Sequence, residues 1–173
     1  MVPRVRIFAL LGALPLTACL ETYPSYEMVK SSREMPVPPG RYQLCETQKN
    51  SCSDVTIRHG DAEMILTHKG DDFVLQADGA SLADNWLVVA KLEGMAVFVW
   101  VDRHKDGVFH IQAPKCHAAL LKKVRGDEAE AEGGRCRVSG QFQAAGYMHA
   151  LFAEPADQRF DPTADMTLRP KSS

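Results

Sequence analysis

The chain lacks several features that would place its 173 residues in a familiar class. It has no run of about 20 apolar residues, the length that a helix needs to cross the hydrocarbon of a bilayer. Its lysines and arginines form no stripe that could neutralise nucleic-acid phosphates, and its formal net charge is -2. We therefore expect neither a permanent transmembrane helix nor a nucleic-acid partner.

Catalytic motifs are also missing. There is no His-Glu-x-x-His, no Gly-x-Ser-x-Gly, no phosphate-binding glycine loop and no dinucleotide fingerprint. Cys116 lies beside His117, but neighbouring side chains on a helix point apart and cannot share a proton. Residues 102–107 lack the alternating acidic ligands of a calcium loop, so we expect a solvated turn there. The histidines are scattered singly, at His59, His68, His104, His110, His117 and His149. We expect no catalytic residue, no metal and no cofactor.

The first 18 residues carry an export pattern. Arg4 and Arg6 form a basic start, an apolar run follows over residues 7–14, and small residues come next. This order is the signature of a signal peptide that is cleaved after export. Its removal takes away two of the 20 basic residues and none of the 22 acidic ones, so the exported chain is the more acidic form.

The end of that pattern, Leu16-Thr17-Ala18-Cys19, resembles the lipobox of bacterial lipoproteins. The resemblance implies that residues 1–18 are removed and that Cys19 carries palmitate and related acyl chains, which together hold a protein on a membrane. In such lipoproteins an aspartate after the cysteine usually retains the protein in the inner membrane, whereas this chain has Leu20. The resemblance therefore implies the inner leaflet of the outer membrane, facing the periplasm. An ordinary signal peptide with an incidental cysteine is the alternative.

The exported chain divides into three segments by composition. Residues 19–40 have four prolines and no periodicity, which predicts a disordered tether whose ends lie roughly 25 Å apart. Residues 41–153 hold the periodic segments and are expected to form a single α+β domain. Residues 154–173 carry Pro155, Pro162 and Pro170 among polar residues, which predicts a flexible C-terminal tail.

Short β-forming runs alternate with turn signals in the first part of the domain. Their spacing, near ten residues, predicts an antiparallel β-meander of about seven short strands. Turn residues such as Lys69-Gly70 and Glu93-Gly94 suit tight hairpins. The expected strands cover residues 41–45, 54–58, 63–67, 73–77, 86–92, 95–101 and 108–112.

Two helices are predicted after the strands. The first covers residues 114–125, where apolar residues recur at four-residue spacing and Gly126 can form a left-handed cap. The second begins after Ser139. Its apolar face is expected to consist of Phe142, Ala145, His149 and Phe152. The predicted fold class is thus α+β, a meander with two C-terminal helices, stapled by disulfides.

Four cysteines remain once Cys19 is set aside. An even number in an exported chain indicates disulfides, because export places thiols in an oxidising compartment. Their spacing does not match a zinc knuckle. Three pairings are possible on paper, and we favour the one in which each bridge closes a segment rich in turn residues. That pairing joins Cys45 to Cys52 and Cys116 to Cys136.

The hairpin around Glu93-Gly94 is apolar on both faces. A two-residue turn pairs Leu92 with Met95 and Trp86 with Val101, which gives one apolar face. The other face carries Leu87, Val89, Phe98 and Trp100. A hairpin of this kind is normally covered on both sides. One of the predicted helices could supply the cover, or the four residues could form a binding surface for a ligand or partner.

These observations predict a membrane-anchored envelope lipoprotein, a non-catalytic binding or structural module whose partner, such as another envelope protein, the sequence leaves open. Two alternatives remain. Tyr42 and Cys45, which open the β-rich domain, resemble the lysozyme-inhibitor lipoproteins, although the Ser-Gly-rich loop and Trp-Lys-Gly segment of those proteins are missing here. That resemblance implies a periplasmic inhibitor of a cell-wall enzyme. The other alternative is a hydrolase or thiol enzyme whose His and Asp side chains meet only in the fold.

Overall fold

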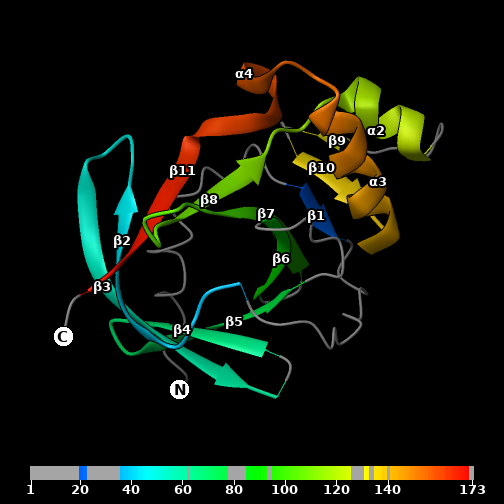
Figure 1. The fold of residues 1–173 in the computed structure, drawn as a ribbon. Helices are drawn as coiled ribbons and strands as arrows, with labels where there is room; N and C mark the ends of the chain where they lie inside the picture. The colour runs from blue at the N-terminus through cyan, green and yellow to red at the C-terminus, as the bar shows by residue number, and fades with distance from the viewer. Residues whose placement is uncertain are drawn as a thin grey trace.

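Eight of the described strands close into an antiparallel barrel (Figure 1). The computed structural model describes residues 20–22, 36–61, 63–77, 85–92, 95–125, 131–132, 135–139 and 141–171. The barrel strands are β2 (Gly40–Glu46), β3 (Ser51–Gly60), β4 (Glu63–His68), β5 (Asp71–Ala77), β6 (Asn85–Leu92), β7 (Met95–Arg103), β8 (Phe109–Pro114) and β11 (Phe160–Pro170). Each pairs with the next in that order, and β11 closes the ring by pairing with both β8 and β2.

A smaller layer covers one side of the barrel. It contains β1 (Leu20–Thr22), β9 (Ala131–Glu132), β10 (Arg135–Val138) and the helices α2 (Ala118–Arg125), α3 (Gln141–Phe152) and α4 (Ala156–Arg159). Strand β1 pairs antiparallel with β7 and parallel with β10, so it joins the layer to the barrel wall. Figure 1 shows α2 and α3 gathered on the outer side of β1 and β10.

Side chains that alternate along the barrel strands fill the interior. The inward residues are apolar in most positions, because a strand exposes successive side chains to opposite faces. The inner core consists of Val37, Tyr42, Leu44, Val55, Ile57, Met64, Leu66, Val88, Val99, Val101, Phe109, Ala113, Ala164, Met166 and Leu168. The barrel is therefore a packed core.

Among the residues that the structure describes, no helix has both the length and the apolar character needed to cross a membrane.

Several sequence predictions are confirmed. The domain is mostly β, with few helices and two disulfides, Cys45–Cys52 and Cys116–Cys136. The predicted hairpin register is correct, because Leu92 pairs with Met95 and Trp86 with Val101. Lys69 and Gly70 both have positive φ angles, as the tight turn predicted between β4 and β5 requires.

The predicted flexible tail is wrong. Residues 154–173 include α4 and the strand β11, which closes the sheet that the sequence predicted as an open meander. The prediction of a flexible tail relied on three prolines, but each of them occupies a position that a strand or helix tolerates. Pro155 precedes α4, Pro162 lies where the β11–β8 register is irregular, and Pro170 ends the strand.

The predicted tether also differs from the structure at both ends. Leu20 to Thr22 form β1, and Val37, which is buried, belongs to the inner core. Strand β1 is too short to show a period, so its composition gave no signal. Residues 23–35 lie outside the described part of the chain, as does Cys19.

The predicted face of the second helix is correct only in part. Phe152 packs against Trp100, and the side chain of Phe142 lies outside the described part of the structure. Residues on α3 that are buried are Ala144, Tyr147, Met148 and Leu151, whereas His149 is exposed. The apolar content of α3 is spread around most of its circumference, so sequence periodicity could not identify the buried face.

Candidate functional site

The predicted binding surface of Leu87, Val89, Phe98 and Trp100 is not exposed, so this prediction is wrong. All four side chains are at most 3% exposed. They form an outer core with the apolar residues of β1, β10, α2 and α3. The Trp100 ring lies 4.8 Å, between centroids, from the ring of Phe152 on α3. The other interpretation of this face, cover by a C-terminal helix, is confirmed.

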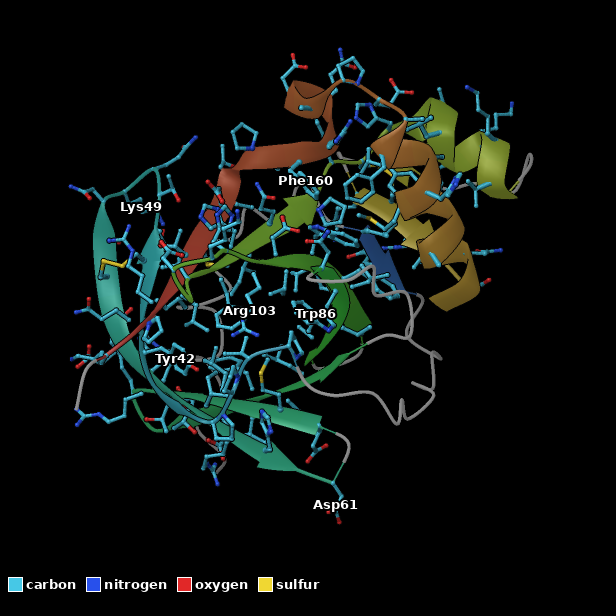
Figure 2. The ribbon with its side chains drawn as sticks, viewed as in Figure 1. Tyr42, Lys49, Asp61, Trp86, Arg103 and Phe160 are labelled. Carbon is cyan, nitrogen blue, oxygen red and sulfur yellow. A yellow bond between two sulfur atoms is a disulfide. The ribbon has the colours of Figure 1, made fainter. Side chains whose placement is uncertain are left out.

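One end of the barrel is closed by the segment that precedes β2. Val37 packs into the inner core, and the Tyr42 hydroxyl donates a hydrogen bond of 2.8 Å to the carbonyl oxygen of Pro38. His59 Nε2 lies 2.8 Å from the Val37 carbonyl oxygen. At the same end, Arg103 lies over the Phe109 ring, and Figure 2 shows it directed into the barrel. These contacts join the segment before β2 to the inner core at this end of the barrel.

The opposite end of the barrel has a cavity of about 340 Å³. We call it the mouth cavity. Its lining consists of Leu44, Glu46, Ser51, Cys52, Ser53, His68, Lys69 and Met166. Strands β2, β3, β4 and β11 supply these residues, except for Lys69 in the turn after β4. The Cys45–Cys52 disulfide crosslinks two of the strands at the rim. Lys49, in the turn that joins β2 to β3, is labelled at this end in Figure 2.

His68 is the most unusual residue of the mouth cavity. It follows Met64 and Leu66 in the inward row of β4 and is 6% exposed. Its Nε2 atom is buried and has no hydrogen-bond partner. Burial lowers the pKa of the His68 imidazole, and Lys69 lowers it further, while Asp71 opposes the shift. Burial therefore favours the neutral form of the ring.

The other polar groups of the mouth cavity are partly neutralised. Glu46 Oε2 lies 2.7 Å from Nζ of Lys49, which balances the one carboxylate of the lining. Ser51 and Ser53 add hydroxyl groups, while Leu44 and Met166 contribute buried apolar surface. This arrangement can accept a ligand that has both hydrogen-bonding and apolar surface.

A second polar cluster lies on the outer face, near the closed end. Asp102 on β7 pairs in register with His110 on β8, and the rings of His104 and His110 stack with centroids 4.2 Å apart. Trp100 Nε1 donates a hydrogen bond of 2.7 Å to Asp102 Oδ1. Burial raises the pKa of the Asp102 carboxyl, although this hydrogen bond and the two histidines act in the opposite direction.

The residues after Asp102 form a solvent-exposed turn, as predicted. His104, Lys105 and Asp106 are exposed, and Gly107 has the positive φ angle that the turn needs. Within the described part of the chain, no three His, Cys, Asp or Glu side chains are grouped so that they could hold a metal ion. The stacked histidines lie on neighbouring segments, since His104 follows β7 and His110 belongs to β8.

Sequence reasoning placed His68, His104 and His110 as isolated residues and so missed both clusters. The alternation of Met64, Leu66 and His68 was a usable signal, because it predicts that His68 faces the same core as its apolar neighbours. The outer cluster of Asp102, His104 and His110 could be recognised only from the pairing register of β7 and β8. Comparisons with protein-family models, with curated proteins and with solved structures found no match to this chain.

Proposed function

We propose that this protein is a membrane-anchored envelope lipoprotein whose barrel is a non-catalytic binding module. Acylation of Cys19 would provide the anchor, and the periplasm would maintain the two disulfides. The observation that best supports the proposal is that strand β1 starts at Leu20, next to the proposed lipid cysteine.

Strand β1 is held firmly in the folded layer. Leu20 is fully buried, and Glu21 is 2% exposed. Glu21 Oε1 accepts a hydrogen bond of 2.9 Å from Nε of Arg137 on β10. Detaching β1 would expose Leu20 and break the ion pair between Glu21 and Arg137, which is unfavourable. Because consecutive Cα atoms lie about 3.8 Å apart, the lipid on Cys19 would join the edge of the fold directly.

The direction of β1 suggests how the barrel stands on the membrane. Strand β1 runs antiparallel to β7, and Leu20 pairs with Phe98. Strand β1 therefore starts nearer the C-terminal end of β7 than it ends, and the hairpin that contains Lys105 follows that end of β7. The mouth cavity lies at the other end of the barrel. We infer that the hairpin end faces the bilayer and that the mouth cavity opens toward the periplasm.

The anchor can be tested by metabolic labelling with radioactive palmitate. The wild-type protein is expected to take up label, whereas the Cys19→Ser variant should lose the label and accumulate as a longer precursor. Thr17→Ser, which keeps a small polar residue in the lipobox, is the matched control and should be labelled like the wild type. Label retained in Cys19→Ser would contradict the proposal.

The orientation can be tested with a fluorescent amino acid at Lys49 or Lys105, which are exposed lysines in turns at the two ends of the barrel. The lipidated protein is reconstituted in vesicles whose headgroups carry a nitroxide quencher. The two ends are separated by roughly 25 Å, the length of an eight-residue strand, so quenching should be much stronger at position 105 than at 49. A Gly-Ser linker of about ten residues behaves as a flexible coil. Inserting it between Cys19 and Leu20 should remove the difference in quenching. Equal quenching without the linker would contradict direct attachment.

A further inference from the structure

We propose that the mouth cavity binds a neutral, hydroxyl-rich ligand with one apolar face, which is the chemistry of a sugar ring. This inference rests on the proposed binding function and names the ligand class for the site around His68. It does not depend on the lipid anchor.

The first argument is the unpartnered Nε2 atom of His68. A buried polar atom without a hydrogen bond is rare in folded proteins and costs free energy. A neutral imidazole nitrogen either donates or accepts, depending on the tautomer. A hydroxyl group can match it in both cases, because it carries one donor and two acceptor lone pairs. A hydroxyl of the ligand would therefore satisfy His68 in either tautomer.

The second argument is the charge balance of the cavity. Glu46, the carboxylate of the lining, is paired with Lys49, and Lys69 is an exposed cation at the rim. Burial and Lys69 together lower the pKa of His68, which favours the neutral imidazole. A strongly charged ligand would meet this balanced ion pair and the imidazole of His68 among the described residues of the lining. A neutral ligand loses less hydration there.

The third argument is the combination of surfaces. Ser51 and Ser53 present hydroxyl groups, whereas Leu44 and Met166 are buried and apolar. A sugar ring has hydroxyl groups around its edge and C–H groups on its face, so it can contact both kinds of wall. The volume of about 340 Å³ lies near the lower end of the range for small-molecule sites, roughly 300–1,000 Å³. The cavity therefore suits a small ligand, such as one or two sugar residues at the end of a glycan.

The test is nuclear magnetic resonance of the lipidated protein in detergent micelles, with nitrogen-labelled histidine. The probe is N-acetylglucosamine, and sodium acetate and choline chloride are the anionic and cationic comparators. We expect the Nε2 signal of His68 to shift with saturation as the sugar is added, while the signal of the exposed His149 on α3 stays in place. Neither salt should saturate the shift at the same concentration.

Variants identify the contacts. Ser53→Ala removes one hydroxyl of the lining and should weaken sugar binding by about tenfold, as expected for one lost hydrogen bond. Ser139→Ala, at an exposed position outside the cavity, should leave the affinity unchanged. Because neither change is in the core, both variants should fold.

Two results would overturn the proposal. If acetate or choline saturates the His68 signal and the sugar does not, the ligand class is wrong. If no probe moves the signal, the cavity holds water only. Either result can occur in a protein that is labelled by palmitate, so failure of this inference is distinguishable from failure of the membrane anchor.

Discussion

The inner core of the barrel and the outer core beneath the helices are built on the same hairpin, β6–β7. Val88 and Val99 face inward, whereas Leu87 and Phe98 face outward. The inner core joins strands that are mostly neighbours along the chain. The outer core instead brings Leu20 into contact with a segment more than 90 residues later, between Cys116 and Phe152. Two apolar faces on one hairpin thus connect a locally built core to one that depends on distant segments.

The strongest test of this comparison removes the same side chain from each core. Leu121→Ala on α2 and Leu168→Ala on β11 both empty fully buried positions and should each lower the free energy of unfolding by about 2–5 kcal/mol. Because the two cores share β6 and β7, we expect them to unfold together. Urea unfolding of protein labelled with fluorotryptophan separates Trp86, which packs against the inner core, from Trp100 in the outer core. Different midpoints for the two signals would show that the helical layer detaches by itself.

The success of sequence reasoning follows the same division. The β6–β7 register could be predicted because a two-residue turn fixes the pairing and the apolar pattern extends over both strands. Strand β1 could not be predicted, since three residues carry no period and its partner Cys136 is distant in the sequence. Strand β11 was hidden by Pro162, which the irregular register tolerates. Local pairing is visible in a sequence, whereas closure of the barrel is not.

The disulfides offer a second comparison between the regions. Cys116–Cys136 spans 20 residues of the helical layer, while Cys45–Cys52 spans seven within one hairpin. In the chain-entropy model, the longer loop restricts the unfolded chain more, so replacing both Cys116 and Cys136 by alanine should cost about 3 kcal/mol. The corresponding change at Cys45 and Cys52 should cost less, roughly 2.5 kcal/mol. Urea unfolding without reductant measures both, and the reverse order would show that native-state contacts outweigh chain entropy.

The candidate site could be predicted from the sequence only in part. The inward direction of His68 could be inferred from the alternation on β4, but the cavity itself could not. It forms where Glu46, Ser53 and Met166 meet. Strands β2 and β3 pair as neighbours along the chain, but Met166 joins them only because β11 pairs with β2. Without the closing strand, the sequence could not show which polar residues share one end of the barrel.

Buried tyrosines give a third, smaller comparison. The Tyr147 hydroxyl donates to the Lys115 carbonyl oxygen at 2.6 Å and accepts from the His117 amide at 2.8 Å, while burial raises the Tyr147 pKa to about 12. Tyr147→Phe should leave both backbone groups unpaired and cost about 2 kcal/mol. Tyr42→Phe in the inner core loses a single hydrogen bond, to Pro38, and should cost about 1 kcal/mol. Thermal unfolding measures the difference, and equal losses would show that water replaces the second bond of Tyr147.

The smallest expected effect concerns His68 and pH. Burial, with a contribution from Lys69, lowers the pKa of this imidazole below its value in the unfolded chain. As the pH falls below about 6.5, the unfolded state takes up a proton before the folded state does, so acid reduces the stability of the fold. His68→Gln keeps a polar side chain but does not titrate. Between about pH 7.5 and pH 5, a range that includes the ordinary histidine pKa, this variant should therefore lose less stability than the wild type. The measurement is the urea midpoint at both pH values, with His149→Gln on the exposed side of α3 as the matched control. A variant that is as acid-sensitive as the wild type would show that the mouth of the barrel, unlike its core, remains open enough for His68 to be hydrated.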